Sequence, residues 1–354
     1  MTLEPGPESG TGSGVEPAAG PAADPSVTPG RSSRRQRLGT IVKIVFGLAV
    51  LGFGIYFFAS RWHEIRPVLA RANWGWLIAA LVFAGIGLSS SAFMLRSLME
   101  MTSRHRLPAP AAARLFFVSQ LGKYLPGSIW PVVVVSQMGR RHGIDGDVAA
   151  TAGVLALFLS LVTGGALGIV VTVAGAASGS GTGLWWLLLL LPVVVLMALP
   201  QVVFRMINVG LKVLRRKPIE FDQAARSHYF AACGFSLLTW TLLGLQCWAI
   251  FIALGADPLP SLLGAVGGFA LAYQAGTLFV PAPAGAGVRE AVLGLTLSGT
   301  LPDSPGFQHS AAVAAVVLLS RVILTVLDFV FAGSSMLLDR RSPLGRTSTD
   351  DALA

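Results

Sequence analysis

Long runs of apolar residues dominate the chain and predict membrane-spanning helices. A hydrocarbon core about 30 Å thick is crossed by roughly 20 apolar residues in a helix. Six runs reach that length, at residues 38–60, 74–99, 148–176, 184–204, 229–254 and 308–337. We therefore predict an all-α polytopic membrane protein with about six full transmembrane helices.

Two further apolar stretches, residues 111–138 and 261–298, are interrupted near the middle by glycine and proline. Both carry Gln-x-Gly followed by a proline, as Gln120, Gly122 and Pro126 in the first and as Gln274, Gly276 and Pro281 in the second. A helical piece of about 11 residues is roughly 16 Å long, about half of the hydrocarbon core. Each half can therefore reach the middle of the membrane and turn back, which predicts two re-entrant helical hairpins.

The placement of positive charge orients these elements, because short cytoplasmic loops collect lysine and arginine. If both interrupted stretches are re-entrant, most of the 26 cationic residues fall on one side, including six within residues 205–226. If the first stretch crossed fully, Arg140, Arg141 and that six-cation loop would be external. The charge pattern thus favours re-entrant hairpins and cytoplasmic N- and C-termini. Three crossings separate the hairpins, which predicts that they form an inverted repeat with a binding site at their meeting point.

Composition defines the predicted domains and excludes some functions. The chain is 53% hydrophobic and only 12% charged, whereas soluble domains carry about 25% charged residues. Residues 38–338 are expected to form one transmembrane domain, preceded by a disordered cytoplasmic tail (residues 1–37) and followed by a cytoplasmic C-terminal tail (residues 339–354). The arginines lie beside hydrophobic spans, where they orient helices and attract anionic lipid headgroups, so nucleic acid is not an expected partner. Five scattered histidines and two distant cysteines predict no metal site, and no cofactor is expected.

Charged residues deep in the predicted membrane segments are the candidate functional residues. They are Lys123, Arg289, Glu290, Arg321 and Asp328. A charge at that depth costs at least a few kcal/mol unless it is paired or hydrated. Lys123 lies at the break of the first hairpin, and Arg289 follows Gly285 and Gly287 at the start of a half-helix. Glycines let a ligand approach the backbone, and a helix N-terminus attracts anions. Together these features predict an anion site suited to phosphate.

Most of the charged candidates have a structural interpretation as well. Glu290 is expected to cap its half-helix and partly neutralise Arg289, with proton coupling as an alternative. For Arg289, ligand contact and structural pairing stay open. Arg321 and Asp328 lie two turns apart on one helix face, so they pair either with each other or with charges on the hairpins.

The uncharged candidates are Gln120, Gln274 and Tyr124. Each glutamine either contacts the ligand or hydrogen-bonds a backbone carbonyl freed at the break. Tyr124 either stacks on a headgroup or lies at the membrane interface.

These motifs also resemble a known family. Two stretches carry the likeness: Gly122-Lys123-Tyr124-Leu125-Pro126-Gly127-Ser128-Ile129-Trp130, followed by Arg141-His142-Gly143-Ile144, and Pro283-Ala284-Gly285-Ala286-Gly287-Val288-Arg289-Glu290-Ala291-Val292-Leu293. They resemble the signatures of the lysylphosphatidylglycerol synthase transmembrane, or flippase-like, family, which includes the membrane half of the bacterial multiple peptide resistance factor. The resemblance covers roughly residues 40–340. It implies movement of an anionic phospholipid or a polyprenyl-linked lipid across the bacterial inner membrane.

Lipid translocation is therefore the leading functional hypothesis. Only sixteen residues follow Leu338, so no aminoacyl-transferring domain is expected there, and the protein is not expected to be an enzyme. A secondary transporter of a soluble organic anion is an alternative, as is a membrane partner of a lipid-modifying synthase encoded separately. The sequence leaves open the lipid, the direction and energy source of movement, and the oligomeric state.

Overall fold

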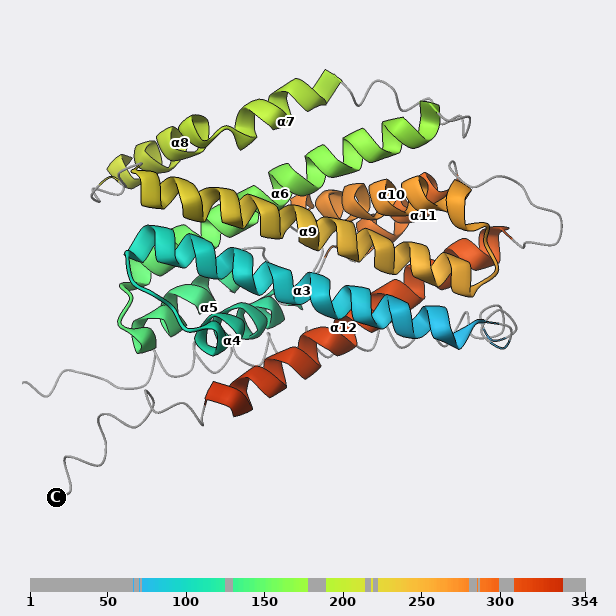
Figure 1. Cartoon of the computed structure of the whole chain (residues 1–354), viewed down its shortest axis with the longest axis horizontal. Helices are drawn as coiled ribbons and strands as arrows, with labels where there is room; N and C mark the ends of the chain where they lie inside the picture. Colours follow the sequence, from blue (N-terminus) through green and yellow to red (C-terminus); the bar gives the residue numbers. More distant parts are fainter. Residues whose placement is uncertain are drawn as a thin grey trace, which may run out of the picture. The chain divides into compact units, whose positions relative to one another are not determined.

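A computed structural model of the chain describes residues 66, 70, 72–124, 130–177, 189–213, 218, 222–279, 285, 287–298 and 309–339 (Figure 1). The regular secondary structure of these residues is entirely helical, with no strand among them. The predicted N-terminal tail, the predicted helix at residues 38–60 and residues 340–354 lie outside the described residues. The fold class predicted from the sequence, an all-α polytopic membrane protein, is confirmed.

Four described helices are long and apolar enough to cross a membrane. They are α3 (Trp74–Ser103), α6 (Gly146–Ala177), α9 (Gln223–Ala253) and α12 (His309–Asp339). Each coincides with one of the six predicted spans. Their apolar character extends around the whole circumference, as it does for helices that face lipid on one side and protein on the other.

Helices α3 and α9 pack against each other in opposite directions. At one end, the Asn73 N–H donates a hydrogen bond to the Ala253 carbonyl (2.8 Å). At the other end, Arg104 pairs with Asp222. The side chains of Asn73 and Asp222 also cap their helices by accepting bonds from Gly75 N–H and Ala225 N–H, which satisfies donors that a helix start leaves unpaired. This antiparallel pair defines the two ends of the helical bundle.

The helix predicted over residues 184–204 is interrupted. In its place the structure has α7 (Leu191–Ala198) and α8 (Pro200–Val213). Leu199 between them is extended, with φ −65° and ψ 130°. Pro200 explains the break, because proline lacks an N–H and disfavours helical backbone in the residue before it. The apolar pattern continues through Leu199, so hydrophobicity alone did not reveal the interruption.

The first interrupted stretch folds back on itself as predicted. Helix α4 (Ala109–Gln120) leads into a short 3₁₀ turn, η1 (Leu121–Tyr124), and α5 (Trp130–Gly139) returns beside it. Gly122 makes this possible, since a Cβ there would lie only 3.0 Å from the backbone nitrogen of Pro131. Helices of 12 and 10 residues are about 18 and 15 Å long, close to half of a hydrocarbon core.

The second interrupted stretch also forms a pair of packed helices, but its two arms are unequal. Helix α10 (Pro258–Leu278) has 21 residues and α11 (Val288–Ser298) has 11. At 1.5 Å per residue α10 is about 31 Å long, as long as the hydrocarbon core is thick. The expectation that each half reaches only the middle is therefore wrong for α10, because 18 of its residues lie within the predicted stretch before the break and its helix also starts three residues earlier, at Pro258.

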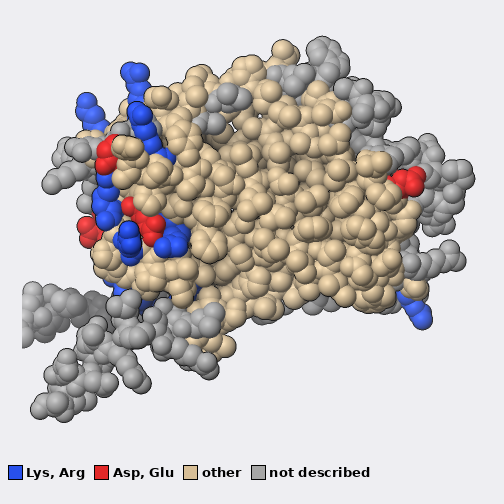
Figure 2. Space-filling view, in the orientation of Figure 1, with Lys and Arg blue, Asp and Glu red and all other residues tan. Residues whose placement is uncertain are grey.

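The two hairpins enter the bundle from opposite ends. Helix α4 starts beside the end of α3, whereas α10 starts beside the end of α9 (Figure 1). Because α3 and α9 are antiparallel, these two starting points lie at opposite ends. The described lysines and arginines gather mainly at the end where α4 starts (Figure 2). This is the opposed arrangement that the charge pattern predicted, and which end faces the cytoplasm stays a prediction.

Candidate functional site

The break of the first hairpin is fastened to α12 by a buried carboxylate. Lys123 Nζ lies 2.6 Å from Asp328 Oδ2, and the Tyr124 hydroxyl donates a hydrogen bond to the same oxygen (2.8 Å). The Asp328 side chain is 0% exposed. The Tyr124 ring also stacks on Phe329, with ring centroids 5.7 Å apart. The Asp328 carboxylate therefore holds the 3₁₀ turn against α12.

The start of α11 is also held to α12 by an ion pair, and here α12 supplies the cation. Glu290 pairs with Arg321 of α12 and accepts a hydrogen bond from the Gly287 N–H (2.6 Å). The helix-start role predicted for Glu290 is confirmed, and its ion-pair partner is Arg321. Of the two arrangements left open for Arg321 and Asp328, the structure has the second, since each pairs with a hairpin residue. These two α12 residues are about 10 Å apart along the helix axis.

Arg289 is held by aromatic rings of α10. Its guanidinium carbon lies 4.6 Å from the ring centre of Tyr273 and 4.9 Å from that of Phe269. Among the described residues no carboxylate comes within ion-pair distance of it. Stacking on aromatic faces orients a guanidinium and contributes about 0.5–2 kcal/mol without neutralising its charge. Arg289 therefore carries positive charge that the two ion pairs do not cancel.

The two hairpin breaks lie close enough to interact. Arg289 of the second hairpin interacts electrostatically with Tyr124 of the first, and Lys123 of the first does so with Tyr273 of the second. Three of the five membrane-depth charges are cations and two are carboxylates. With each carboxylate paired to one cation, one positive charge is in excess where the breaks meet. Such a place attracts a negatively charged group.

The two glycines before α11 have different roles. Gly285 and Gly287 adopt positive φ angles of 68° and 86°, which side chains other than glycine disfavour. A Cβ at Gly285 would lie 2.7 Å from the Cα of Gly276, so Gly285 permits close packing against α10. A Cβ at Gly287 would meet nothing within 4 Å. The space beside Gly287 is thus open, and its N–H is bonded to Glu290.

The two predicted glutamines also differ. Gln274 is buried, and its Nε2 donates to the Ser160 carbonyl of α6 (3.3 Å), which also accepts a bond from Trp240 Nε1 (3.0 Å). Its carbonyl-binding role is observed, with a neighbouring helix as the acceptor. Gln120 is half-buried and makes no hydrogen bond to a described residue. It stays a candidate for ligand contact.

The sequence did not identify the two rings that contact Arg289, nor a buried polar residue of α9 that bonds α12. Phe269 and Tyr273 supply the rings under Arg289, and their spacing of four places them on one face of α10. Gln246 of α9 is 0% exposed and accepts a bond from Ser320 of α12. A buried polar residue inside an apolar helix was a signal for Gln246, whereas nothing local to the sequence linked the two rings to Arg289.

Within the described ranges no group of three His, Cys, Asp or Glu side chains comes together as a metal ion would require.

Comparison with known families identifies one family for most of the chain. Residues 41–332 match the family model described as "Lysylphosphatidylglycerol synthase TM region". The matched region contains both hairpins and most of α12. A comparison with curated proteins gave no significant match.

Proposed function

This chain belongs to the lysylphosphatidylglycerol synthase transmembrane family, and on that premise we propose that it moves an anionic phospholipid or a polyprenyl-linked lipid between the leaflets of the bacterial inner membrane. The observation that carries this proposal is the uncancelled charge of Arg289 where two opposed hairpin breaks meet. The proposal gives the protein no catalytic step. Its partners are the lipid and, in a variant of the same role, a separately encoded enzyme that modifies the lipid.

In the proposed mechanism Arg289 binds the headgroup phosphate. A guanidinium can donate two parallel hydrogen bonds to phosphate oxygens, which is the strongest geometry for this anion. The aromatic rings of Tyr273 and Phe269 hold the guanidinium from one side and leave its N–H edge for the ligand. At mid-membrane these hydrogen bonds replace part of the hydration that the phosphate loses in the hydrocarbon.

Lys123 is the second proposed phosphate ligand. Its side chain is 20% exposed, whereas that of its partner Asp328 is 0% exposed. The Lys123 ammonium has three N–H donors, so it can donate to a phosphate while it keeps Asp328 as a partner, and no buried ion is left unpaired. Arg321 lies near Arg289 and adds attraction at longer range. Because each hairpin has its own ion pair to α12, one hairpin can move away from α12 while the other stays in place.

A second candidate function is the secondary transport of a soluble organic anion. One observation favours it: Asp328 Oδ1 is buried without a hydrogen-bond partner among the described residues. This unpartnered oxygen makes Asp328 the residue proposed to couple such transport to a second ion. Uptake of a soluble anion that follows an imposed pH gradient, in vesicles without lipid exchange, would identify this function.

Reconstitution in vesicles tests the lipid proposal. Vesicles containing the wild-type chain are expected to move fluorescent phosphatidylglycerol between leaflets faster than protein-free vesicles do. The double variant Lys123→Ala/Arg289→Ala should move it no faster than protein-free vesicles, because both proposed phosphate ligands are gone. The measurement is the fraction of label that a membrane-impermeant quencher reaches over time.

The matched control is Arg141→Ala, which removes an exposed arginine at one end of the bundle. It should exchange lipid at the wild-type rate. Equal exchange by wild type and the double variant would refute the proposed site.

A further inference from the structure

A cleft with several charged side chains in its lining lies at the end of the bundle where lysines and arginines gather, apart from the hairpin breaks. It is formed by the end of α3, the segment leading to α4 and the start of α9, and its volume is about 510 Å³. Its lining includes three arginines, two histidines and one carboxylate, namely Arg96, Arg104, Arg106, His105, His228 and Glu100. Figure 2 shows blue side chains concentrated at this end. The cleft is thus suited to an anion.

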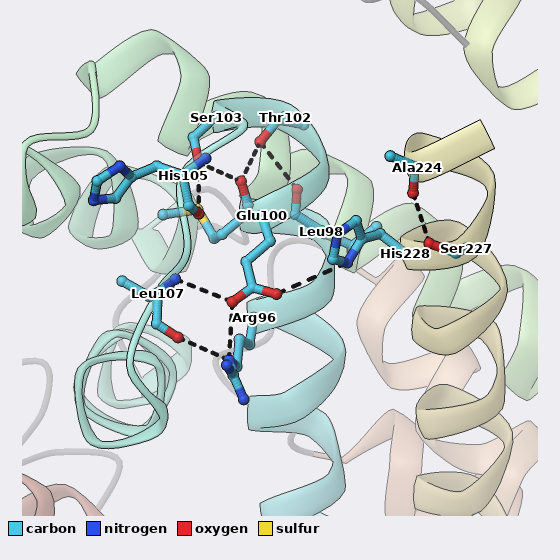
Figure 3. Close-up of polar contacts among 11 residues, drawn as sticks. Arg96, Leu98, Glu100, Thr102, Ser103, His105, Leu107, Ala224, Ser227 and His228 are labelled. Atoms are coloured by element: carbon cyan, nitrogen blue, oxygen red, sulfur yellow. Dashed lines mark hydrogen bonds and ion pairs between the residues drawn. The ribbon is translucent and has the colours of Figure 1, made fainter. Parts of the chain in front are cut away.

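The only carboxylate among these lining residues is already bound by donors. Glu100 Oε1 accepts hydrogen bonds from Arg96 Nε (3.2 Å) and from the Leu107 N–H (3.0 Å). Its Oε2 lies 3.8 Å from His228 Nδ1. Figure 3 shows Glu100 between these three groups. The negative charge of Glu100 is therefore compensated by these neighbouring groups and offers little repulsion to an incoming anion.

Arg96 is fixed in a way that leaves its terminal nitrogens for a ligand. Its Nε donates to Glu100 and to the Leu107 carbonyl (2.8 Å). Neither terminal nitrogen makes a hydrogen bond to a residue that the structure describes (Figure 3). A guanidinium anchored through Nε presents its two terminal N–H groups as a fork that matches phosphate oxygens. Arg106 is exposed and its guanidinium has no partner in the described part of the chain.

The backbone at the rim of the cleft is in an uncommon conformation. Arg104 ends α3 with φ 57° and ψ 16°, and its N–H bonds to the Glu100 carbonyl. Glycine usually occupies this left-handed position, because another residue costs about 1–2 kcal/mol there. The Arg104 side chain pairs with Asp222, and this hydrogen bond holds the pKa of that carboxyl below its usual value. The turn ties α3 to α9 and directs the chain so that His105 and Arg106 line the cleft.

We propose that this cleft binds a phosphate ester, with Arg96 and Arg106 as its cationic ligands and His105 and His228 beside them. Its position at the end of the bundle distinguishes it from the anion site at the hairpin breaks. The phosphate belongs either to the headgroup of a membrane lipid or to a soluble molecule, and the same residues recognise both. Binding here requires no movement of lipid, so it holds or fails independently of the translocation proposed above.

Binding measurements on the full chain carrying Arg289→Ala test the cleft, because that background removes one of the two proposed hairpin ligands. In one arm, nanodiscs contain phosphatidylglycerol in phosphatidylcholine, and native mass spectrometry counts the phosphatidylglycerol retained. In the other, inorganic phosphate is titrated calorimetrically into protein in pure phosphatidylcholine nanodiscs. Adding Arg106→Ala should weaken binding about tenfold in whichever arm shows binding. This is the effect of losing one charge-assisted contact.

Two further variants make the result specific. Arg141→Ala, a substitution of an exposed arginine that does not line the cleft, should bind like the Arg289→Ala background. Arg106→Lys, which keeps the charge, should lose less affinity than Arg106→Ala. Sensitivity to Arg106→Ala in the lipid arm supports a headgroup, and in the phosphate arm a soluble phosphate. Insensitivity in both arms, or no binding in either, overturns the proposal.

Discussion

Replacing Asp328 with alanine is expected to lower the free energy of unfolding by about 3–5 kcal/mol, the cost of leaving a buried ion without its partner. Asp328 is 0% exposed and bonds both Lys123 and the Tyr124 hydroxyl. Its removal leaves the Lys123 ammonium in apolar surroundings with no counter-ion. Reversible denaturation of the purified protein in mixed micelles measures the change.

Adding Lys123→Met to that variant should restore most of the lost stability. The double substitution replaces an ion pair with apolar side chains, which is often neutral or stabilising in protein interiors. If the two losses simply add, Lys123 and Asp328 do not act as a pair, and the fastening of the first hairpin to α12 is wrong. Tyr124→Phe in the wild-type background should lower the free energy of unfolding by about 1 kcal/mol, the contribution of the hydroxyl hydrogen bond to Asp328.

Replacing Arg289 with alanine is expected to slow lipid exchange about 10- to 100-fold. That range corresponds to a lost charge-assisted contact of about 1.5–3 kcal/mol with phosphate. Asp328 has an ion-pair partner, whereas Arg289 has none among the described residues. Removing Arg289 therefore leaves no buried anion without a partner. Unfolding free energy should therefore fall only by the aromatic stacking contribution of about 0.5–2 kcal/mol. Exchange in vesicles and denaturation of the same preparation separate the two effects.

Lysine at position 289 provides the matched comparison. It keeps a cation near Tyr273 and Phe269 but loses the planar fork, so its exchange rate should lie between those of alanine and arginine. A lysine variant as slow as alanine would mean that fork geometry governs binding. An alanine variant as fast as wild type would remove Arg289 from the proposed mechanism.

Much of this fold could be predicted from the sequence because a membrane imposes simple rules. Apolar length identified α3, α6, α9 and α12, and glycine with proline identified both hairpin breaks. Charge asymmetry predicted their opposed entry. Hydrophobicity did not reveal the break at Pro200, because the apolar residues of α7 continue through Leu199 and resume at Val202. It also did not reveal the full length of α10, since composition does not report how far a helix continues toward a break.

The candidate site was less predictable, because its pairs are long-range. Depth in the membrane identified the five charged residues. Because Arg321 and Asp328 lie two turns apart on one face of α12, the sequence allowed them to pair either with each other or with charges on the hairpins. The pairs with Glu290 and Lys123 depend on how both hairpins dock on α12, and no local pattern encodes that. The rings under Arg289 come from α10 for the same reason.

Opposed entry of the hairpins is the premise of the proposed site, and labelling of engineered cysteines tests it most directly. In a chain with Cys233→Ala and Cys247→Ala, single cysteines replace Arg140, at the open end of the first hairpin, and Asp257, at the start of the second. Both positions are exposed. A membrane-impermeant maleimide should label Arg140→Cys only in inside-out vesicles and Asp257→Cys only in right-side-out vesicles. Labelling of both cysteines from the same side would contradict the inverted arrangement and the meeting of the two breaks.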